Sequence, residues 1–288
     1  MEKERLFLRP EQFYTDQNIT LRLGNPVTAI DPKAQTITVA GEVLAYDQLA
    51  LTTGSNPRHL PANIGGALDG VHVVRSLDDV DAMGAEMSAG KRALIIGGGY
   101  IGLEAAAVAS KMGLEVTVVE MADPRWNVDV VIVGVGITPG DALASEAGLT
   151  INNGIETDAH GRTSDPNIWA AGDCASFPWQ EGRIRLESVQ NAIDQAELVA
   201  ENIMGAGKDY VPAPWFWSDQ YDVKLQIAGL NTGYDTIAVR QTGGYVLLVL
   251  QGRQTAGRRR NERPAELHDR QALDRGGQKP CRRPRNQS

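Results

Sequence analysis

The chain has 288 residues, and its 28 Lys and Arg against 36 Asp and Glu give a formal net charge of -8. With 42% hydrophobic and 22% charged residues, it has the composition of a globular protein and the length of about two domains. The longest apolar stretch, 93–110, contains three successive glycines and a glutamate, and the charged start has no apolar run after it, so we expect neither a membrane span nor a signal peptide.

The first part of the chain is predicted to form short strands and one helix. Alternating apolar residues at 19–23, and apolar runs bounded by turn residues at 27–30 and 36–39, are typical of short strands. The segment 76–79 has the sequence of a capping box, which predicts an amphipathic helix from there to about Ala89.

A complete βαβ unit is predicted next. Residues 92–96 form a short apolar run suited to a buried parallel strand. The glycine-rich segment 97–102 leads into an alanine-rich helix that ends at about Met112. Residues 115–120 are predicted to form a second buried strand, which completes a unit of about thirty residues.

Further strands and a second long helix follow. Parallel-type strands are predicted at 129–134 and 168–171, and strand-like runs return at 223–228 and 245–250. Residues 187–203 are predicted to form a helix with one apolar face, consisting of Val189, Ala192, Ile193, Ala196 and Val199. Strands that alternate with helices in this way predict an α/β fold built on parallel sheets.

The spacing of Gly97, Gly99 and Gly102 is that of a dinucleotide-binding turn. The first glycine allows the tight turn, the second lets the backbone approach a pyrophosphate, and the third lets the helix pack on the strand. The N-terminus of the helix attracts phosphates. Glu120, at the end of the next strand, can bind the ribose hydroxyls and would repel a 2′-phosphate, which favours NADH over NADPH; Arg125 is a less direct candidate for holding that phosphate. The alternative is a βαβ unit whose glycines serve packing alone.

Five segments together resemble one protein family, and they cover most of positions 1–250. The segments are 46–54, 97–104, 163–173, 187–192 and 215–221. In these segments the chain resembles the FAD-dependent, NADH-dependent ferredoxin reductases of the pyridine nucleotide–disulfide oxidoreductase superfamily, in the class that serves bacterial oxygenase systems. The resemblance implies an α/β fold with two Rossmann-like dinucleotide-binding domains, here incomplete, and a partial α+β C-terminal domain. It also implies electron transfer from NADH through FAD to a ferredoxin-type iron–sulfur protein.

The resemblance also assigns the site residues. NADH would be held by Gly97, Gly99, Tyr100, Ile101, Gly102 and Glu120, with Glu104 as the catalytic residue near the nicotinamide. FAD would be held by Thr53, Gly54, Gly172, Asp173, Glu187, Ser188, Val189 and Trp217. From the residues alone other roles stay open: Asp173 as a helix N-cap, Glu104 as a helix charge, the helix at 187–203 as a core helix, and Trp215 and Trp217 as core aromatics.

The cysteines and histidines indicate no metal site and no dithiol. Cys174 and Cys281 are far apart in sequence, which excludes a disulfide framework, a cysteine zinc cluster and a CxxC pair. The four histidines show no ligand spacing. We therefore expect electrons to leave the flavin directly for an external carrier, without a thiol relay, in a reduced, cytoplasmic compartment.

The resemblance divides the chain into five parts. We expect a first FAD-domain segment over 1–70, a shortened NADH-binding domain over 71–139, a second FAD-domain segment over 140–208, a partial C-terminal reductase domain over 209–252, and a basic disordered tail over 253–288.

The chain departs from the family in three places. The glycine-rich unit that binds the ADP half of FAD would precede Met1, so we expect weak or absent FAD retention. Between Glu120 and Asp129 only eight residues stand where the family has a helix and several strands, so we expect exposed sheet edges. After about Leu250 the resemblance is expected to end, and the tail over 253–288 has 11 basic and four acidic residues but no aromatic ones, which favours a solvated tail over a nucleic-acid-binding one. The alternative function is a catalytically incompetent NADH-binding remnant that lacks the FAD pyrophosphate site.

Overall fold

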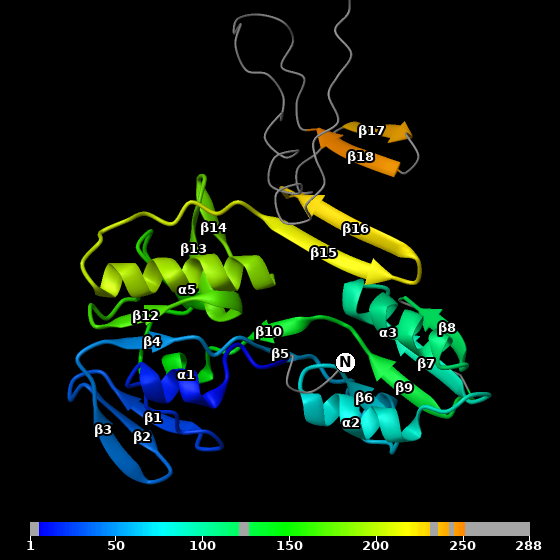
Figure 1. Cartoon of the computed structure of the whole chain (residues 1–288), viewed down its shortest axis with the longest axis horizontal. Coiled ribbons are helices and arrows are strands. Elements are labelled where there is room, and N and C mark those ends of the chain that lie inside the picture. Colours follow the sequence, from blue (N-terminus) through cyan, green and yellow to red (C-terminus); the bar gives the residue numbers. More distant parts are fainter. Residues whose placement is uncertain (1–5, 121–126, 231–235, 242–244, 251–288) are drawn as a thin grey trace, which may run out of the picture. The chain divides into compact units, whose positions relative to one another are not determined.

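The computed structural model describes residues 6–120, 127–230, 236–241 and 245–250 (Figure 1). The chain forms two compact units: the first extends to residue 212 and includes 218–225, and the second contains 213–217 and the residues from 226 on. No helix in the described ranges is long and apolar enough to cross a membrane. The predicted tail over 253–288 and Arg125 lie outside the described residues.

The first unit contains a four-stranded parallel sheet in the order β6-β9-β7-β8. Its strands are β6 (Val71–Val73), β9 (Val130–Val133), β7 (Arg92–Ile96) and β8 (Glu115–Val119). The helix α3 (Tyr100–Lys111) joins β7 to β8. The predicted βαβ unit is therefore confirmed, with each boundary within a residue or two of the expected position.

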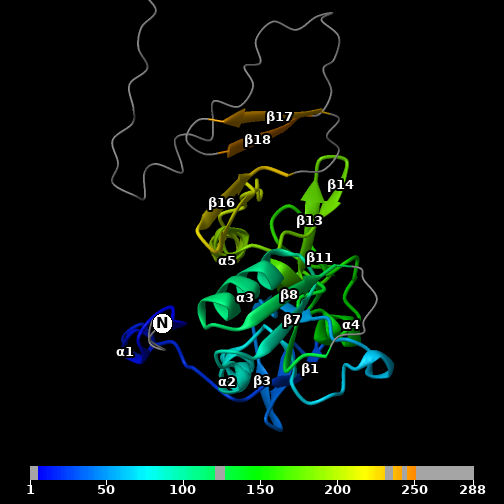
Figure 2. The ribbon, with the colours of Figure 1, turned by 90° about the vertical axis from the view of Figure 1, so that its right-hand side faces the viewer.

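One face of this sheet packs against two helices. Ile95 of β7 and Ile132 of β9 lie in a buried cluster with Met83 of α2 (Leu77–Glu86) and Ala106 of α3. The helices α2 and α3 and the strand β7 can be followed in Figure 2, and β9 in Figure 1. Burying an aliphatic side chain of this size contributes roughly 1.5–3 kcal/mol, so this cluster fixes α3 and with it the glycine turn from which the helix starts.

The predicted capping box opens α2. The Ser76 hydroxyl accepts the backbone N–H of Asp79 at 3.2 Å, and the Asp79 carboxylate accepts the backbone N–H of Ser76 at 2.7 Å. The helix ends at Glu86 and not at Ala89, because the backbone is already extended at the C-cap Met87, where φ is -80° and ψ is 104°.

The strand β8 is an edge strand within the described part of the chain, since it pairs with β7 alone. The prediction that this strand is buried is wrong: Glu115 is exposed and Val118 is 39% exposed. The physical reason is that the described residues place no further strand beside it. The expectation of an exposed sheet edge is confirmed.

The rest of the first unit is built from small sheets and short helices. The sheets are β1 (Val27–Asp31), β2 (Thr36–Val39) and β3 (Glu42–Ala45); β4 (Leu49–Leu51) parallel to β12 (Ile168–Ala170); and β11 (Ile155–Glu156), β13 (Ala175–Trp179) and β14 (Gly182–Ile184). The helical segments are α1 (Glu11–Asp16), η2 (Ala62–Ile64), α4 (Ala142–Glu146), η3 (Gly172–Cys174) and α5 (Val189–Ile203). Leu51, Ile155 and Ile168 form the centre of the apolar core of this part. The strands predicted at 27–30, 36–39 and 168–171 are thus present.

The segments that precede and follow the four-stranded sheet in the sequence pair with each other. The strand β5 (Ser55–Pro57), which precedes β6, pairs antiparallel with β10 (Ile137–Pro139), which follows β9. The backbone N–H of Gly140 donates to the Gly54 carbonyl at 2.8 Å, and the Thr53 hydroxyl donates to the Gly140 carbonyl. A Cβ at Gly140 would lie 2.6 Å from the carbonyl oxygen of Thr53, so the close contact requires glycine there.

The strand expected at 19–23 is absent from the structure. Ile19, Leu21 and Leu23 alternate as in a strand, but they are 47%, 40% and 79% exposed. The backbone N–H of Ile19 instead donates to the Tyr14 carbonyl at 2.8 Å, which continues the turn at the end of α1. Alternation predicts a strand when a neighbouring strand and a core are available, and the described residues provide neither here.

The helix α5 begins at Val189, two residues later than predicted. Ser188 is its N-cap, and its hydroxyl accepts the backbone N–H of Asn191 at 3.3 Å. Glu187 therefore lies before the helix. The predicted apolar face is wrong at two positions, since Val189 and Ile193 are 58% and 45% exposed.

The buried face of α5 is mostly polar. Its buried residues are Asn191, Gln195, Val199 and Asn202. The Asn191 amide donates to the Leu186 carbonyl at 3.1 Å and accepts the Tyr210 hydroxyl at 2.8 Å. Burial, and after it the charge of Asp194, raises the pKa of Tyr210. The Asn202 amide donates to the carbonyls of His160 and Lys208 at 2.9 and 2.8 Å. Hydropathy missed this face because hydrogen-bonded amides can be buried as well as aliphatic side chains.

The second unit consists of strands in the described residues. The strand β15 (Trp215–Gln220), which begins in it, pairs with β16 (Val223–Ala228). The strands β17 (Thr236–Gln241) and β18 (Tyr245–Leu250) form an antiparallel pair in which Thr236 is opposite Leu250. The strands predicted at 223–228 and 245–250 are confirmed.

Candidate nucleotide and flavin sites

Close packing explains two of the three glycines in the predicted dinucleotide turn. Gly97 has a φ of +107°, and a Cβ there would lie 2.2 Å from the Gly134 carbonyl oxygen. A Cβ at Gly102 would lie 2.1 Å from the Gly97 carbonyl oxygen. Gly99 differs, because a Cβ there would meet no other residue closer than the Gly134 oxygen at 4.0 Å. The missing side chain of Gly99 therefore leaves space beside the turn, as the approach of a pyrophosphate requires.

The glycine turn ends at the N-terminus of α3. Gly99 is the N-cap, and no side chain among the described residues caps the helix there. The first N–H groups of a helix have no partner within it and carry a partial positive charge, so they attract phosphate groups. Tyr100 and Ile101, the first two residues of α3, have side chains that are 41% and 45% exposed.

Glu120 lies directly after β8, next to the same turn. Its carboxylate oxygen Oε2 accepts the backbone N–H of Gly98 at 2.6 Å. Its other oxygen, Oε1, has no partner in the described ranges. This places a negative charge with one open acceptor at the position where the sequence predicts the adenosine ribose.

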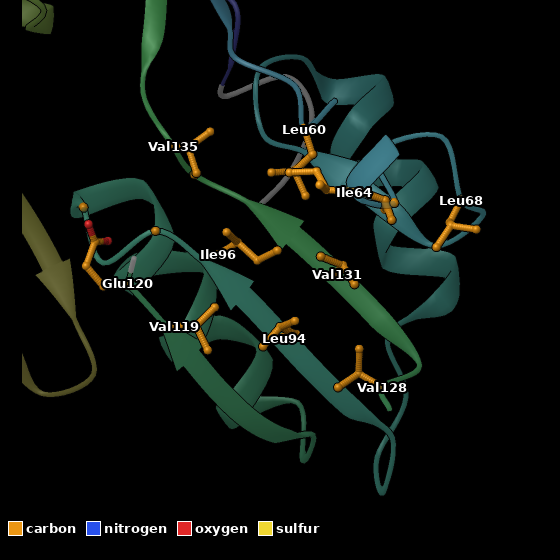
Figure 3. Close-up of a pocket in the computed structure, with 15 residues that line it drawn as sticks. Leu60, Ile64, Leu68, Leu94, Ile96, Val119, Glu120, Val128, Val131 and Val135 are labelled. Atoms are coloured by element: carbon orange, nitrogen blue, oxygen red, sulfur yellow. The ribbon is translucent and has the colours of Figure 1, made fainter. Parts of the chain in front are cut away.

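A cavity of about 610 Å³ opens beside the turn (Figure 3). Gly97, Gly99 and Glu120 lie at one end of it. Its walls are aliphatic: the sheet face turned away from α2 and α3 contributes Leu94, Ile96, Val119 and Val131, and the segment 60–68 contributes Leu60, Ile64 and Leu68. The cavity thus combines an apolar wall, suited to a planar base, with a polar end suited to a ribose and a pyrophosphate.

Glu104 lies one turn into α3 and is half-buried. The hydroxyl of Ser218 donates to its oxygen Oε1 at 2.6 Å, and the Gln220 side-chain amide donates to the Ser218 oxygen at 3.1 Å. Ser218 is 0% exposed. Glu104 is therefore a hydrogen-bonded carboxylate and not a solvated helix charge.

Asp173 lies in η3, directly after β12. Its oxygen Oδ2 accepts the hydroxyl of Ser55 at 3.0 Å, and Oδ1 has no partner among the residues that the structure describes. Ser55 is the residue after Gly54, so Asp173 lies beside the predicted flavin residues Thr53 and Gly54. Asp173 does not act as an N-cap through its side chain, and one oxygen is left to accept a hydroxyl group.

Gly172 is fixed by its backbone. Its φ of +80° requires glycine, and its N–H donates to the Gln195 oxygen Oε1 at 2.8 Å. Gln195 is 0% exposed, and its amide nitrogen has no hydrogen-bond partner in the described residues. A buried donor without a partner is costly, so this nitrogen marks a place where a bound group can supply an acceptor.

Arg185 connects two predicted flavin residues. One guanidinium nitrogen donates to the Asp173 carbonyl at 3.1 Å, and the other lies 2.6 Å from the Glu187 carboxylate. Its side chain is 8% exposed. Glu187 is therefore neutralised by an ion pair and lies beside the start of α5, where Ser188 is the N-cap and Val189 is exposed.

Trp217 belongs to the second unit. Its ring stacks on that of Trp215, with ring centroids 5.1 Å apart and an interplanar angle of 29°. Trp217 is 41% exposed, so the alternative that it is a core aromatic is wrong. Trp215 is half-buried, so Trp217 is the ring of the pair that is open to a planar group or a partner.

Cys174 is buried with no exposed surface, and its thiol donates to the carbonyls of Ala171 and Leu51 at 3.3 and 3.5 Å. Cys174 packs in the apolar core beside β4 and β12. Within the described residues there is also no group of three or more His, Cys, Asp or Glu side chains that could hold a metal ion.

The structure brings the predicted residues together in two groups. Gly97, Gly99 and Glu120 lie around one cavity, and the segments with Thr53, Gly54, Asp173 and Glu187 are connected by hydrogen bonds or ion pairs. Sequence reasoning missed the connecting residues, which are Ser55, Arg185, Gln195 and Ser218. Ser55 directly follows the motif at 46–54 and Ser218 lies inside the one at 215–221, but nothing in the sequence distinguishes Arg185 or Gln195. The binding role of each residue stays a prediction.

Two protein-family models match the chain. The model described as pyridine nucleotide-disulphide oxidoreductase matches residues 2–126 and 123–196, and the model described as reductase C-terminal matches residues 215–282. The chain belongs to the pyridine nucleotide-disulphide oxidoreductase family. The two parts of the first match meet at the short connection between β8 and β9. The second match extends past Leu250, so the expectation that the resemblance ends there, which rested on the change in composition, is wrong.

Relatives of this oxidoreductase are 35% to 38% identical to it over the aligned residues. Rhodocoxin reductase of Rhodococcus erythropolis is 38% identical over 83% of this chain and 68% of its own length. A ferredoxin–NAD(P)(+) reductase of a Sphingomonas species is 38% identical over 85% of this chain and 73% of its own length. Putidaredoxin reductase of Pseudomonas putida is 35% identical over 92% and 77%.

Solved structures of the same class have the same fold. The reductase of the covalent putidaredoxin reductase–putidaredoxin complex is 34% identical, with a TM-score of 0.81 over 88% of this chain and 75% of that one. A ferredoxin reductase from Rhodopseudomonas palustris is 33% identical, with a TM-score of 0.80 over 87% and 75%. The predicted α/β fold of FAD- and NAD-binding reductases is confirmed.

Proposed function

We propose that the chain is a flavoprotein oxidoreductase that passes electrons from NADH through FAD to a ferredoxin-type iron–sulfur protein. The observation that carries the proposal is its similarity to named rhodocoxin, ferredoxin and putidaredoxin reductases, at 35% to 38% identity over 83% to 92% of the chain. The names of those proteins state their function, and we assign the same function to this chain as part of the proposal.

The nucleotide end of the site supports NADH as the electron donor. The pyrophosphate would lie at the N-terminus of α3, beside Gly99, and the adenosine would lie in the apolar cavity. Glu120 would accept a ribose hydroxyl through its open oxygen. Its charge would repel the 2′-phosphate of NADPH, which supports NADH over NADPH.

The flavin end supports FAD. Asp173 has one carboxylate oxygen open to a hydroxyl of the ribityl chain, and the buried Gln195 amide lacks an acceptor. Thr53, Gly54, Gly172, Glu187, Ser188 and Val189 complete the proposed flavin contacts within the first unit. The start of α5 would direct backbone N–H groups at the ring edge that becomes negative on reduction.

When held by these residues, FAD would supply the chemistry that couples a two-electron hydride transfer to one-electron transfer. The chain itself must hold the nicotinamide and exclude water, because hydride transfer depends on orientation and not on an acid or base. We propose Glu104 as the group that contacts the nicotinamide. The described cysteine, Cys174, is buried on backbone carbonyls, which supports an electron path without thiols.

The proposed domain division follows the same assignment. The first FAD segment would end near residue 70, the NADH-binding domain would extend to 139, and the second FAD segment to 208. The strand β5 precedes β6 and pairs with β10, which follows β9. This pairing supports the boundaries at 70 and 139 to within about a dozen residues. The sparse cysteines and the use of NADH support a cytoplasmic location.

One series of measurements on the purified full chain tests the function. Titration calorimetry with NADH is expected to give saturable binding, and added FAD is expected to show a shifted visible spectrum and to be bleached by NADH. The absorbance of an added oxidised [2Fe–2S] ferredoxin is then expected to fall. Binding of NADH without bleaching of FAD would overturn the proposal in favour of the NADH-binding remnant.

A further inference from the structure

Three polar side chains form a directed chain of hydrogen bonds that ends on α3. The Gln220 amide donates to the Ser218 oxygen, and the Ser218 hydroxyl donates to the Glu104 oxygen Oε1. Because the Ser218 oxygen already accepts the amide, its own proton is directed at Glu104. Bonds in such a chain strengthen one another.

The burial of Ser218 makes this arrangement rigid. A hydroxyl that is 0% exposed must find its hydrogen bonds in the protein, and Ser218 has both an acceptor and a donor. A hydrogen bond to a carboxylate is shorter and stronger than one between neutral groups, and this one is 2.6 Å long. Glu104 is thereby held in one orientation.

The second oxygen of Glu104 stays available. Oε2 has no partner in the described ranges, although Oε1 is held by Ser218. Glu104 lies one turn from the helix end at which the pyrophosphate would bind. A carboxylate held in one orientation can accept a hydrogen bond from the nicotinamide carboxamide better than a mobile one, because less side-chain freedom is lost on binding.

We propose that Ser218, supported by Gln220, is a positioning residue that holds Glu104 for the nicotinamide half of NADH. Ser218 itself touches neither substrate nor cofactor. The inference rests on the proposed function, because it assumes that Glu104 meets the nicotinamide. It predicts that loss of the Ser218 hydroxyl affects the nicotinamide half of the nucleotide and not the adenosine half.

The test compares two ligands that differ in the nicotinamide. ADP-ribose retains the adenosine, the pyrophosphate and the second ribose of NADH but lacks the ring. Titration calorimetry of the Ser218→Ala chain is expected to show a loss of about tenfold in NADH affinity, as for one hydrogen bond to a charged group, with ADP-ribose affinity unchanged. The control is Ser110→Ala, which removes an exposed serine from α3, the helix that carries Glu104. It is expected to change neither the NADH affinity nor the ADP-ribose affinity.

A second variant and a double mutant separate positioning from general stability. Gln220→Ala, at a half-buried position, is expected to lower NADH affinity by about threefold with the same selectivity for the ring. In a Glu104→Ala background, Ser218→Ala is expected to cause no further loss, because it acts through Glu104.

Three results would overturn the inference. They are an equal loss of NADH and ADP-ribose affinity in Ser218→Ala or Gln220→Ala, no loss of either, and additive losses in the double mutant. A parent chain that binds neither ligand would instead overturn the proposed function, so the two failures can be told apart.

Discussion

The Glu120 carboxylate and the backbone N–H of Gly98 are joined by a hydrogen bond of 2.6 Å. The group expected to hold the ribose is therefore attached to the turn expected to hold the pyrophosphate. The two halves of the adenosine diphosphate would be recognised by one rigid element. The charge of Glu120 is then decisive for the choice between NADH and NADPH.

Glu120→Gln tests that choice. The amide keeps the shape of the side chain but removes its charge, so NADH affinity is expected to fall about tenfold. NADPH affinity is expected to fall less or to rise, because the repulsion of the 2′-phosphate is lost. Titration calorimetry with both nucleotides measures the ratio, and Glu115→Gln, exposed at the start of the same strand, is the matched control. An unchanged ratio in Glu120→Gln would contradict the assignment.

Gly102→Ala tests the packing of α3 on the glycine turn. The added Cβ would lie 2.1 Å from the Gly97 carbonyl oxygen, so the free energy of unfolding is expected to fall by about 2 kcal/mol or more. Gly84→Ala is the control, because Gly84 lies inside α2 with no atom within 4 Å of its Cβ position. Alanine there is expected to raise the free energy of unfolding by roughly 0.5–1 kcal/mol. Urea denaturation measures both, and equal effects would contradict the interpretation.

Asp79 makes the stability of α2 depend on pH. The hydrogen bonds from the backbone N–H and then the hydroxyl of Ser76 lower the pKa of the Asp79 carboxyl below its usual value of 3.8. A carboxyl with a lowered folded-state pKa stabilises the protein above its unfolded-state pKa, and this stabilisation is lost as the pH falls through the folded-state value.

Asp79→Asn is therefore expected to cost roughly 0.5–1 kcal/mol at pH 7, a small effect because the side chain is screened by solvent. The difference from the parent chain is expected to shrink as the pH is lowered from 5 towards about 3, near and below the usual aspartate pKa. Thermal or urea unfolding across that range measures it, with Asp78→Asn as the neighbouring control. A difference that is constant with pH would show that the carboxylate charge is not involved.

Asp173→Asn tests the flavin end separately from the nucleotide end. The variant keeps a side chain that can contact Ser55 but loses the charge of the open oxygen, so FAD affinity is expected to fall about tenfold. Binding of ADP-ribose is expected to be unchanged. Quenching of FAD fluorescence on titration with protein measures the first, and Glu181→Gln, exposed between β13 and β14, is the control. A loss of ADP-ribose affinity of the same size would indicate a general loss of fold.

Elements with a strong local signal could be predicted from the sequence. The capping box at Ser76, the turn at Gly97 and the following helix depend on neighbouring residues, and the structure confirms them. The edge position of β8 and the absence of a strand at 19–23 depend on which segments pair with them. Pairing across the sheet is decided by residues distant in sequence, so periodicity alone could not predict it.

Some residues of the candidate site could likewise be predicted from the sequence, and others could not. Gly97, Gly99 and Glu120 could be found because their spacing is fixed by the turn that they form. Ser218 could not, since its role depends on contact with Glu104, 114 positions away in the sequence. Arg185 is one arginine among many until the fold places it between Asp173 and Glu187.

The amide groups along the buried side of α5 have a further consequence. An aliphatic contact surface allows a helix to slide by a fraction of a turn, because any apolar neighbour serves. Asn191, Gln195 and Asn202 each hold backbone groups of particular residues, so sliding would break several bonds at once. These hydrogen bonds therefore fix α5 at one position along its own axis. Replacing these residues with leucine of similar volume would give an apolar buried side but lose the bonds that set the register.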